Sequence, residues 1–103
     1  MIEIVRGTTP TLVFSFPAGT LLNVQEIVLD ISQGTRKQTI SNLREAISGN
    51  TLTVMLTQRE TLFFDEGAAE MQLNWIYTNG HRASSTVMDC TYSRNLHNEV
   101  MGA

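Results

Sequence analysis

The sequence predicts an all-β fold: an immunoglobulin-like antiparallel β-sandwich of about seven or eight strands, with one short helical turn near residues 58–63. Three observations support this. Apolar residues recur at every second position, turn-forming residues separate the alternating runs, and no long segment has the 3.6-residue period of an amphipathic helix. The alternation stops after Arg94. We therefore expect one domain over residues 1–96 and a flexible or partner-ordered tail over residues 97–103.

Each strand is expected to turn one face toward a core. The alternating runs cover residues 11–16, 27–32, 51–57 and 71–77. Because successive side chains of a strand point to opposite faces, every second residue of these runs lies inside. The residues predicted to form the core are Phe14, Phe16, Leu29, Val54, Leu73, Trp75, Met88 and Cys90.

Turn signals separate the strands in chain order. GTTP at residues 7–10 interrupts the opening strand, and Pro10 cannot donate to a ladder, so this strand should lie at a sheet edge. PAGT at 17–20 and QGTR at 33–36 also predict turns. The segment NLREAI, residues 42–47, is compatible with either a strand or a single helical turn.

The strongest local prediction is a hairpin at YTNGHR, residues 77–82. Asn79-Gly80 between alternating strands favours a two-residue loop with a type I′ turn, which needs positive φ at both central positions. A two-residue loop fixes the register so that paired residue numbers sum to 159. The expected cross-strand pairs are Trp75 with Ser84, Leu73 with Thr86, and Met71 with Met88.

The segment TQRETLFFDEG, residues 57–67, predicts a structural corner between the two sheets. Thr57 and Glu60 have the spacing of a capping box, in which each side chain binds the other residue's backbone N–H. The residues assigned to this corner are Thr57, Glu60, Leu62, Phe63 and Gly67, with Leu62 and either Phe63 or Phe64 closing the end of the sandwich. The alternative is a carboxylate site for acid/base chemistry or calcium, made of Glu60, Asp65 and Glu66. We favour the corner, because no oxygen-rich ligand spacing accompanies these acids.

No catalytic, cofactor or metal site is predicted. Cys90, His81 and His97 are the residue types of a Cys/His site, but an extended strand places Cys90 roughly 30 Å from His81. Zinc needs about four ligands, and these three are poorly placed. The simpler interpretation is a buried cysteine and two surface histidines.

Composition excludes several classes of protein. The net charge is −3, charged residues make up 17% and are scattered, and no basic stripe is present, so nucleic-acid binding is disfavoured. No apolar run approaches the roughly 18 to 20 residues of a membrane helix, and the N-terminus does not resemble a signal peptide. The single cysteine fits assembly in a reducing cytoplasm.

Two features of the sequence point to partners. Val13, Val28, Met55, Ile76 and Val87 fall on the predicted outward faces of their strands, and apolar residues that cluster on a surface mark an assembly site. The opening and closing strands also leave sheet edges to which another strand can be added. A candidate ligand or partner surface at the hairpin end comprises Tyr77, Asn79, His81 and Arg82.

Three segments together resemble small prophage-encoded β-sandwich proteins of Gram-positive bacteria. They are IEIVRGTTPTLVFSF, TVMLTQRETLFF and EMQLNWIYTNGHRASSTVMDCTYSRNL, and they are similar to the N-terminal domain of phage baseplate upper proteins. Thr8 stands where that group has an aspartate.

The resemblance implies a non-enzymatic structural or adaptor role, with no cofactor, in a phage tail or baseplate. The implied partners are other phage structural subunits or further copies of the chain, and neither nucleic acid nor a membrane is expected. The implied locations are the bacterial cytoplasm during assembly and the virion. The alternative is an accessory domain that binds carbohydrate or another ligand through the hairpin end.

Overall fold

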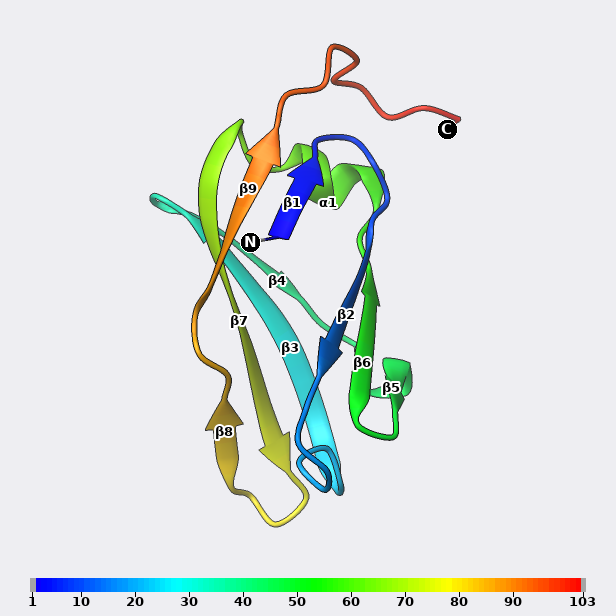
Figure 1. Ribbon diagram of the computed structural model, residues 1–103, viewed down its shortest axis with the longest axis vertical. Helices are drawn as coiled ribbons and strands as arrows, with labels where there is room; N and C mark the ends of the chain where they lie inside the picture. Colours follow the sequence, from blue (N-terminus) through cyan, green and yellow to red (C-terminus); the bar gives the residue numbers. More distant parts are fainter. Residues whose placement is uncertain (1, 103) are drawn as a thin grey trace.

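Two β-sheets form the molecule in a computed structural model that describes residues 2–102 (Figure 1). Residue 1, at the start of the predicted domain, and residue 103, at the end of the predicted tail, lie outside the described residues. Sheet A contains β1 (Ile2–Val5), β3 (Val24–Gln33), β4 (Arg36–Ile40), β7 (Gly67–Tyr77), β8 (Arg82–Ser84) and β9 (Met88–Ser93). Sheet B contains β2 (Thr11–Ser15), β5 (Ile47–Ser48) and β6 (Thr51–Met55), and two short helical segments complete the fold: the 3₁₀ turn η1 (Arg44–Ala46) and helix α1 (Gln58–Leu62).

The strand order confirms the predicted immunoglobulin-like sandwich. Sheet A has the order β1-β9-β7-β3-β4, with β8 also paired to β7, and sheet B has the order β2-β6-β5. Strands β9, β7, β3 and β4 correspond to strands G, F, C and C′ in one sheet of a variable-type immunoglobulin domain. Strands β2, β6 and β5 correspond to B, E and D in the other sheet. One pair departs from the antiparallel pattern, because β1 runs parallel to β9.

The core lies between the two sheets and follows the predicted alternation. Six residues expected there are buried: Phe14, Leu29, Val54, Leu73, Trp75 and Cys90. Phe16 and Met88 were expected in the core as well, but both are only half-buried. They lie on a side of the sandwich that no strand of residues 2–102 covers, where the Phe16 ring meets the Trp75 ring edge-on at 5.4 Å.

The opening strand is split as GTTP predicts, and both halves lie at sheet edges. β1 ends one path of sheet A, and after residues 6–10 the chain continues as β2 at the edge of sheet B (Figure 1). The segment of residues 42–47, which was compatible with a strand or a single helical turn, contains both. The 3₁₀ turn η1 leads directly into β5.

The predicted two-residue hairpin loop is wrong. Tyr77 pairs with His81, so the loop has three residues, and of these only Gly80 has positive φ, at 89°. The Tyr77 carbonyl accepts from Gly80 N–H, and the Asn79 side chain accepts from His81 N–H, which favours a type I turn with a glycine bulge.

The longer loop shifts the register of β8. Trp75 therefore faces Ala83 and not Ser84, while Met71 still faces Met88 as predicted. The extra residue is absorbed at Ser85, whose hydroxyl accepts from Leu73 N–H and whose own N–H donates to the Leu73 carbonyl. The predicted pair of Leu73 with Thr86 is therefore absent.

The corner between β6 and β7 contains the predicted capping box. The Thr57 hydroxyl accepts from Glu60 N–H at 3.2 Å, and the Glu60 carboxylate accepts from Thr57 N–H at 2.8 Å. The residue that closes the end of the core is Phe64, which is fully buried, whereas Phe63 is 37% exposed and lies under the Arg36 guanidinium. Of the two residues expected as alternatives for this position, Phe64 therefore points inward and Phe63 outward.

Two residues that no sequence motif revealed hold the corner against the loop at residues 6–10. The buried Thr61 hydroxyl donates to the Thr8 carbonyl at 2.8 Å and accepts from Gly7 N–H at 2.9 Å. The Arg6 guanidinium donates from Nε to the Phe64 carbonyl at 2.6 Å and from Nη2 to the Leu62 carbonyl at 3.1 Å. These bonds fix sheet B against sheet A at this end of the sandwich.

We predict that Thr61→Val lowers the free energy of unfolding by about 1–3 kcal/mol, because the Gly7 N–H and the Thr8 carbonyl each lose a partner at a partly buried position. Thr61→Ser is the matched control, since it keeps the hydroxyl and removes only a methyl group, at a cost of about 1 kcal/mol. Urea unfolding measures both variants. If Thr61→Val were as stable as Thr61→Ser, these hydrogen bonds would not hold the corner.

Candidate functional site

The four residues expected to form a surface at the hairpin end do not converge. Tyr77, Asn79 and His81 border a shallow hollow of about 490 Å³ together with the turn near Asn23. Arg82 lies on β8 and reaches over the outer face of sheet A, where it contacts the Asn74 side chain at 3.5 Å. The Tyr77 hydroxyl is engaged inside the protein.

That hydroxyl donates to the Thr20 carbonyl at 2.7 Å and accepts from the Trp75 indole N–H at 3.0 Å. Trp75 itself is only 7% exposed, so its ring is no platform for a sugar. The other polar side chains that border the hollow belong to Asn23, Thr78, Asn79 and His81, and all four are exposed. The hollow is thus bordered by exposed turn residues and does not enclose a ligand.

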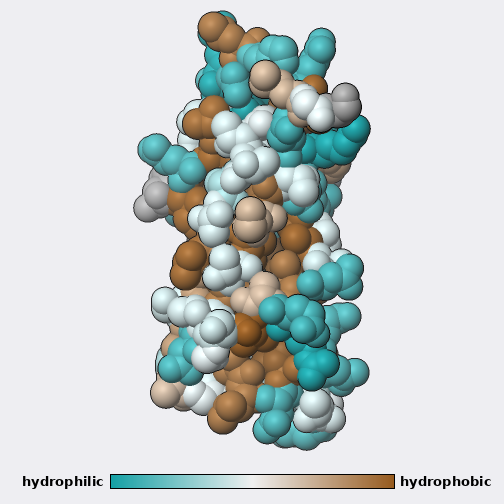
Figure 2. Space-filling model, turned by 90° about the vertical axis from the view of Figure 1, so that its right-hand side faces the viewer, coloured by the Kyte–Doolittle hydropathy of each residue, from teal (hydrophilic) through white to brown (hydrophobic). Residues whose placement is uncertain are grey.

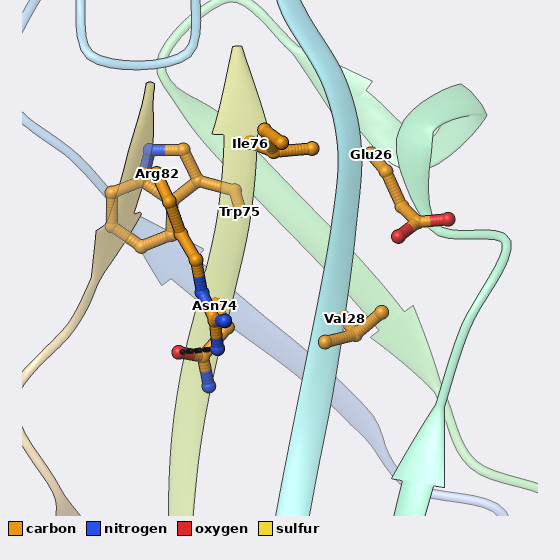
Figure 3. A pocket seen from close by; sticks show the side chains of 6 residues that line it. All are labelled: Glu26, Val28, Asn74, Trp75, Ile76 and Arg82. Carbon is orange, nitrogen blue, oxygen red and sulfur yellow. Dashed lines mark hydrogen bonds between the residues drawn. The ribbon is translucent and has the colours of Figure 1, made fainter. Parts of the chain in front are cut away.

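The outer face of sheet A carries a second shallow hollow, between β3 and β7 (Figure 3). Val28 and Ile76 form its apolar floor, with Glu26 on one side and Arg82 on the other (Figure 3). Its volume is about 270 Å³.

Next to this hollow, the polar side chains of sheet A are bonded to one another. Asp30 accepts from the Asn74 amide at 3.0 Å and from the Thr39 hydroxyl at 2.6 Å. The Asn74 carbonyl oxygen in turn accepts from Ser84 and Arg82. These groups stabilise cross-strand pairs, and none of them is positioned against a nucleophile.

Two of the three acidic residues of the corner, Glu60 and Asp65, have structural partners. Glu60 caps α1, and Asp65 lies 3.7 Å from Arg36 and exchanges two backbone hydrogen bonds with the Gln33 side chain. Among residues 2–102, no group of three or more His, Cys, Asp or Glu side chains is placed to hold a metal ion. Within the same range no helix is long and apolar enough to cross a membrane.

Cys90 is enclosed in the core and is 1% exposed. Burial raises the pKa of its thiol to about 11, and the charges of Asp89 and Glu70 add to the rise. Burial likewise raises the pKa of the neighbouring core hydroxyl of Tyr92 far above its ordinary value. Both groups are therefore neutral and protonated at physiological pH, and the thiolate form that reactive cysteines use is disfavoured.

The most distinctive surface of the molecule is sheet B, which contains no charged residue. The chain has no Asp, Glu, Lys or Arg from residue 7 to residue 25 or from residue 46 to residue 58. All three strands of sheet B come from these two segments. The charges look scattered along the sequence, but the fold gathers them on sheet A, the corner and the connecting segments.

Two large apolar side chains project from the outer face of this uncharged sheet. Val13 on β2 is 61% exposed and Met55 on β6 is 69% exposed. On this face Thr53 lies directly opposite Val13, and Met55 is the diagonal neighbour of Val13. Figure 2 shows this side of the molecule, where hydrophobic and neutral residues form a band down the middle. An uncharged face with exposed apolar residues is a candidate site for protein packing.

The outward positions of Val13, Val28, Met55, Ile76 and Val87 agree with the sequence-based expectation, since none of them is buried. Val13 and Met55 are neighbours only because β2 pairs with β6, and no local pattern in the sequence predicts that pairing.

No protein-family model matches the sequence, and no curated protein shows significant similarity to it.

We predict that the free energy of unfolding falls as the pH rises above about 9. The unfolded chain releases the Cys90 proton near pH 9.0 and the Tyr92 proton near pH 10.0, whereas the native state retains both. The native state therefore binds more protons than the unfolded state in this range, and stability declines through about pH 11. Urea unfolding at a series of pH values measures the slope. The double variant Cys90→Val, Tyr92→Phe should flatten it, and an equal slope in both proteins would contradict the assignment.

Proposed function

We propose that this protein is a non-enzymatic structural or adaptor module of a phage or prophage, associated with the tail or baseplate. It acts by packing against other phage structural subunits or against copies of itself. The observation that carries the proposal is the uncharged sheet B, with Val13 and Met55 exposed on its outer face.

The physical argument starts from the cost of covering a surface. Charged side chains must lose water when a partner covers them, and this loss offsets much of the attraction between opposite charges. The outer face of sheet B presents only hydroxyl and apolar side chains along β2 and β6, so covering it removes no charge from water. Interface centres are similarly depleted of charged residues. Sheet B therefore has the composition of a surface that packs against protein.

The family resemblance supports the phage setting. Its first segment covers β1 and β2, its second runs from Thr53 in β6 through α1, and its third runs from Glu70 in β7 through β9. These segments include both halves of the split opening strand, the capped corner and the bulged hairpin. The resemblance therefore covers two of the segments that join sheet B to sheet A, together with the hairpin of sheet A.

A second candidate is an accessory domain that binds carbohydrate, favoured by the hollow at the hairpin end beside Tyr77, Asn79 and His81. The volume of about 490 Å³ falls within the range of small-molecule pockets, roughly 300–1,000 Å³. The internal hydrogen bonds of Tyr77 place this candidate second. A glycan array with His81→Ala as the control distinguishes the two proposals.

We predict that the purified protein binds at least one tail or baseplate protein encoded beside its gene, or associates with itself. Sedimentation velocity measures self-association, and interferometry measures binding to the purified neighbours. Thr53→Glu places a charge in the middle of the uncharged face and should weaken the association about tenfold or more.

Thr35→Glu is the matched control, because Thr35 is exposed in the turn between β3 and β4, away from sheet B. It should leave the association unchanged. A protein that stays monomeric and binds none of its neighbours would contradict the proposal.

A further inference from the structure

The five edge strands in the described part of the chain differ in how they are protected. Sheets commonly guard their edges with charged side chains or with very short strands. β1 carries Glu3, β4 carries Arg36 and Lys37, and β8 carries Arg82, while β5 has only two residues. β2 is different, because it has five residues and lies within the uncharged segment of residues 7–25.

The free side of β2 offers unpaired backbone groups. Phe16 N–H donates to the Asn50 carbonyl, and Leu56 N–H donates to the Pro10 carbonyl, so the even-numbered residues of β2 direct their backbone groups toward β6. The N–H and C=O groups of Thr11, Val13 and Ser15 consequently point to the free side. No strand within residues 2–102 pairs with that side.

An apolar hollow of about 620 Å³ lies beside this edge. It lies between β2 and the β8–β9 connection, and residues of both segments contribute to its lining. Its apolar lining includes Ile2, Phe14, Phe16, Leu73, Trp75 and Met88. A strand added to the free side of β2 would place the side chains of one of its faces over this hollow.

We propose that the occupant is β2 of a second copy of this chain, paired antiparallel about a two-fold axis at Val13. This inference rests on the proposed packing function and names the partner. The two three-stranded sheets then form one continuous six-stranded sheet, and the apolar hollow of each copy is covered by the other. Pro10 and Pro17 flank β2 and confine the pairing to the segment between them.

The sequence of β2 is self-complementary in this register. Val13 pairs with Val13 of the second copy, and Thr11 pairs with Ser15, so hydroxyl faces hydroxyl on the outer face. On the inner face, Leu12 of one copy lies opposite Phe14 of the other; Phe14 lines the apolar hollow, and Leu12 packs against the core. The two-fold axis makes the Thr11–Ser15 and Leu12–Phe14 contacts occur twice, and the Val13 pair lies on the axis itself. The lack of charge on β2 means that two identical edges approach without repulsion.

Sedimentation equilibrium from micromolar to millimolar protein tests the inference. We expect the wild type to form a dimer. Val13→Lys should raise its dissociation constant about tenfold or more, because the two introduced ammonium groups meet at the two-fold axis. Thr35→Lys places the same charge in the exposed turn between β3 and β4, away from β2, and should dimerise like the wild type. An equimolar mixture of Val13→Lys and Val13→Glu should recover the dimer.

A second variant tests the register without relying on repulsion. Directly opposed residues in a hydrogen-bonded pair have Cα atoms about 5.5 Å apart, which is within the range that a disulfide spans. Val13→Cys should therefore form a disulfide-linked dimer under mild oxidation, whereas Met55→Cys should not. The buried Cys90 does not compete.

The failure of this inference is distinct from failure of the proposed function. A dimer that persists in Val13→Lys and lacks the Val13→Cys cross-link would overturn pairing through β2 while self-association stands. A wild-type monomer that binds another phage subunit through β2 would overturn the second copy as occupant and keep the packing function. A monomer that binds no subunit would remove both.

Discussion

The arrangement of the two sheets depends on the contact between the corner after β6 and the loop after β1. Each of these segments carries the chain from one sheet to the other, and Arg6 and Thr61 join them through four hydrogen bonds of 2.6–3.1 Å. Phe64 fills the space beneath them and packs against the ring of Tyr92 at 5.2 Å. The contact sets where β2 and β6 lie above sheet A. One side of the sandwich is closed in this way, and the side beside Phe16 and Met88 remains open.

This arrangement also explains how a chain of ordinary composition acquires an uncharged sheet. The segments that contain β2 and β6 are separated by the charged strands β3 and β4 in sequence, and they become neighbours only through the sandwich topology. Sheet A keeps its charges because they pair or face water, as Asp30 does with Lys37 and Thr39. The two faces of the sandwich therefore differ in what they can bind. Sheet B suits a protein surface, and sheet A suits solvent.

Much of the fold follows from short-range patterns in the sequence. The alternation placed Leu29, Val54 and Leu73 inside, and the spacing of Thr57 and Glu60 predicted the cap because both of its hydrogen bonds are local. The hairpin shows the limit of such patterns. Asn-Gly suits either a two-residue or a three-residue loop, and the choice depends on whether Ser85 can absorb the extra residue farther along the strand.

The long-range contacts had no signal in a single sequence. Thr61 and Arg6 act on loops more than 50 residues away, so no local spacing reveals them. The candidate surface at the hairpin end was predicted as four neighbouring residues, but strand alternation directs Arg82 away from the rest. The uncharged face could be assembled only once β2 was known to pair with β6.

The most direct test of this account is amide hydrogen exchange of β2 measured by NMR at low and high protein concentration. We predict that the amides of Leu12 and Phe14 are protected at every concentration, because they bond to β6. The amides of Thr11, Val13 and Ser15 should exchange fast in dilute solution and become protected as the concentration rises. Fast exchange of these three amides at all concentrations would show that the edge of β2 stays open and would contradict the account.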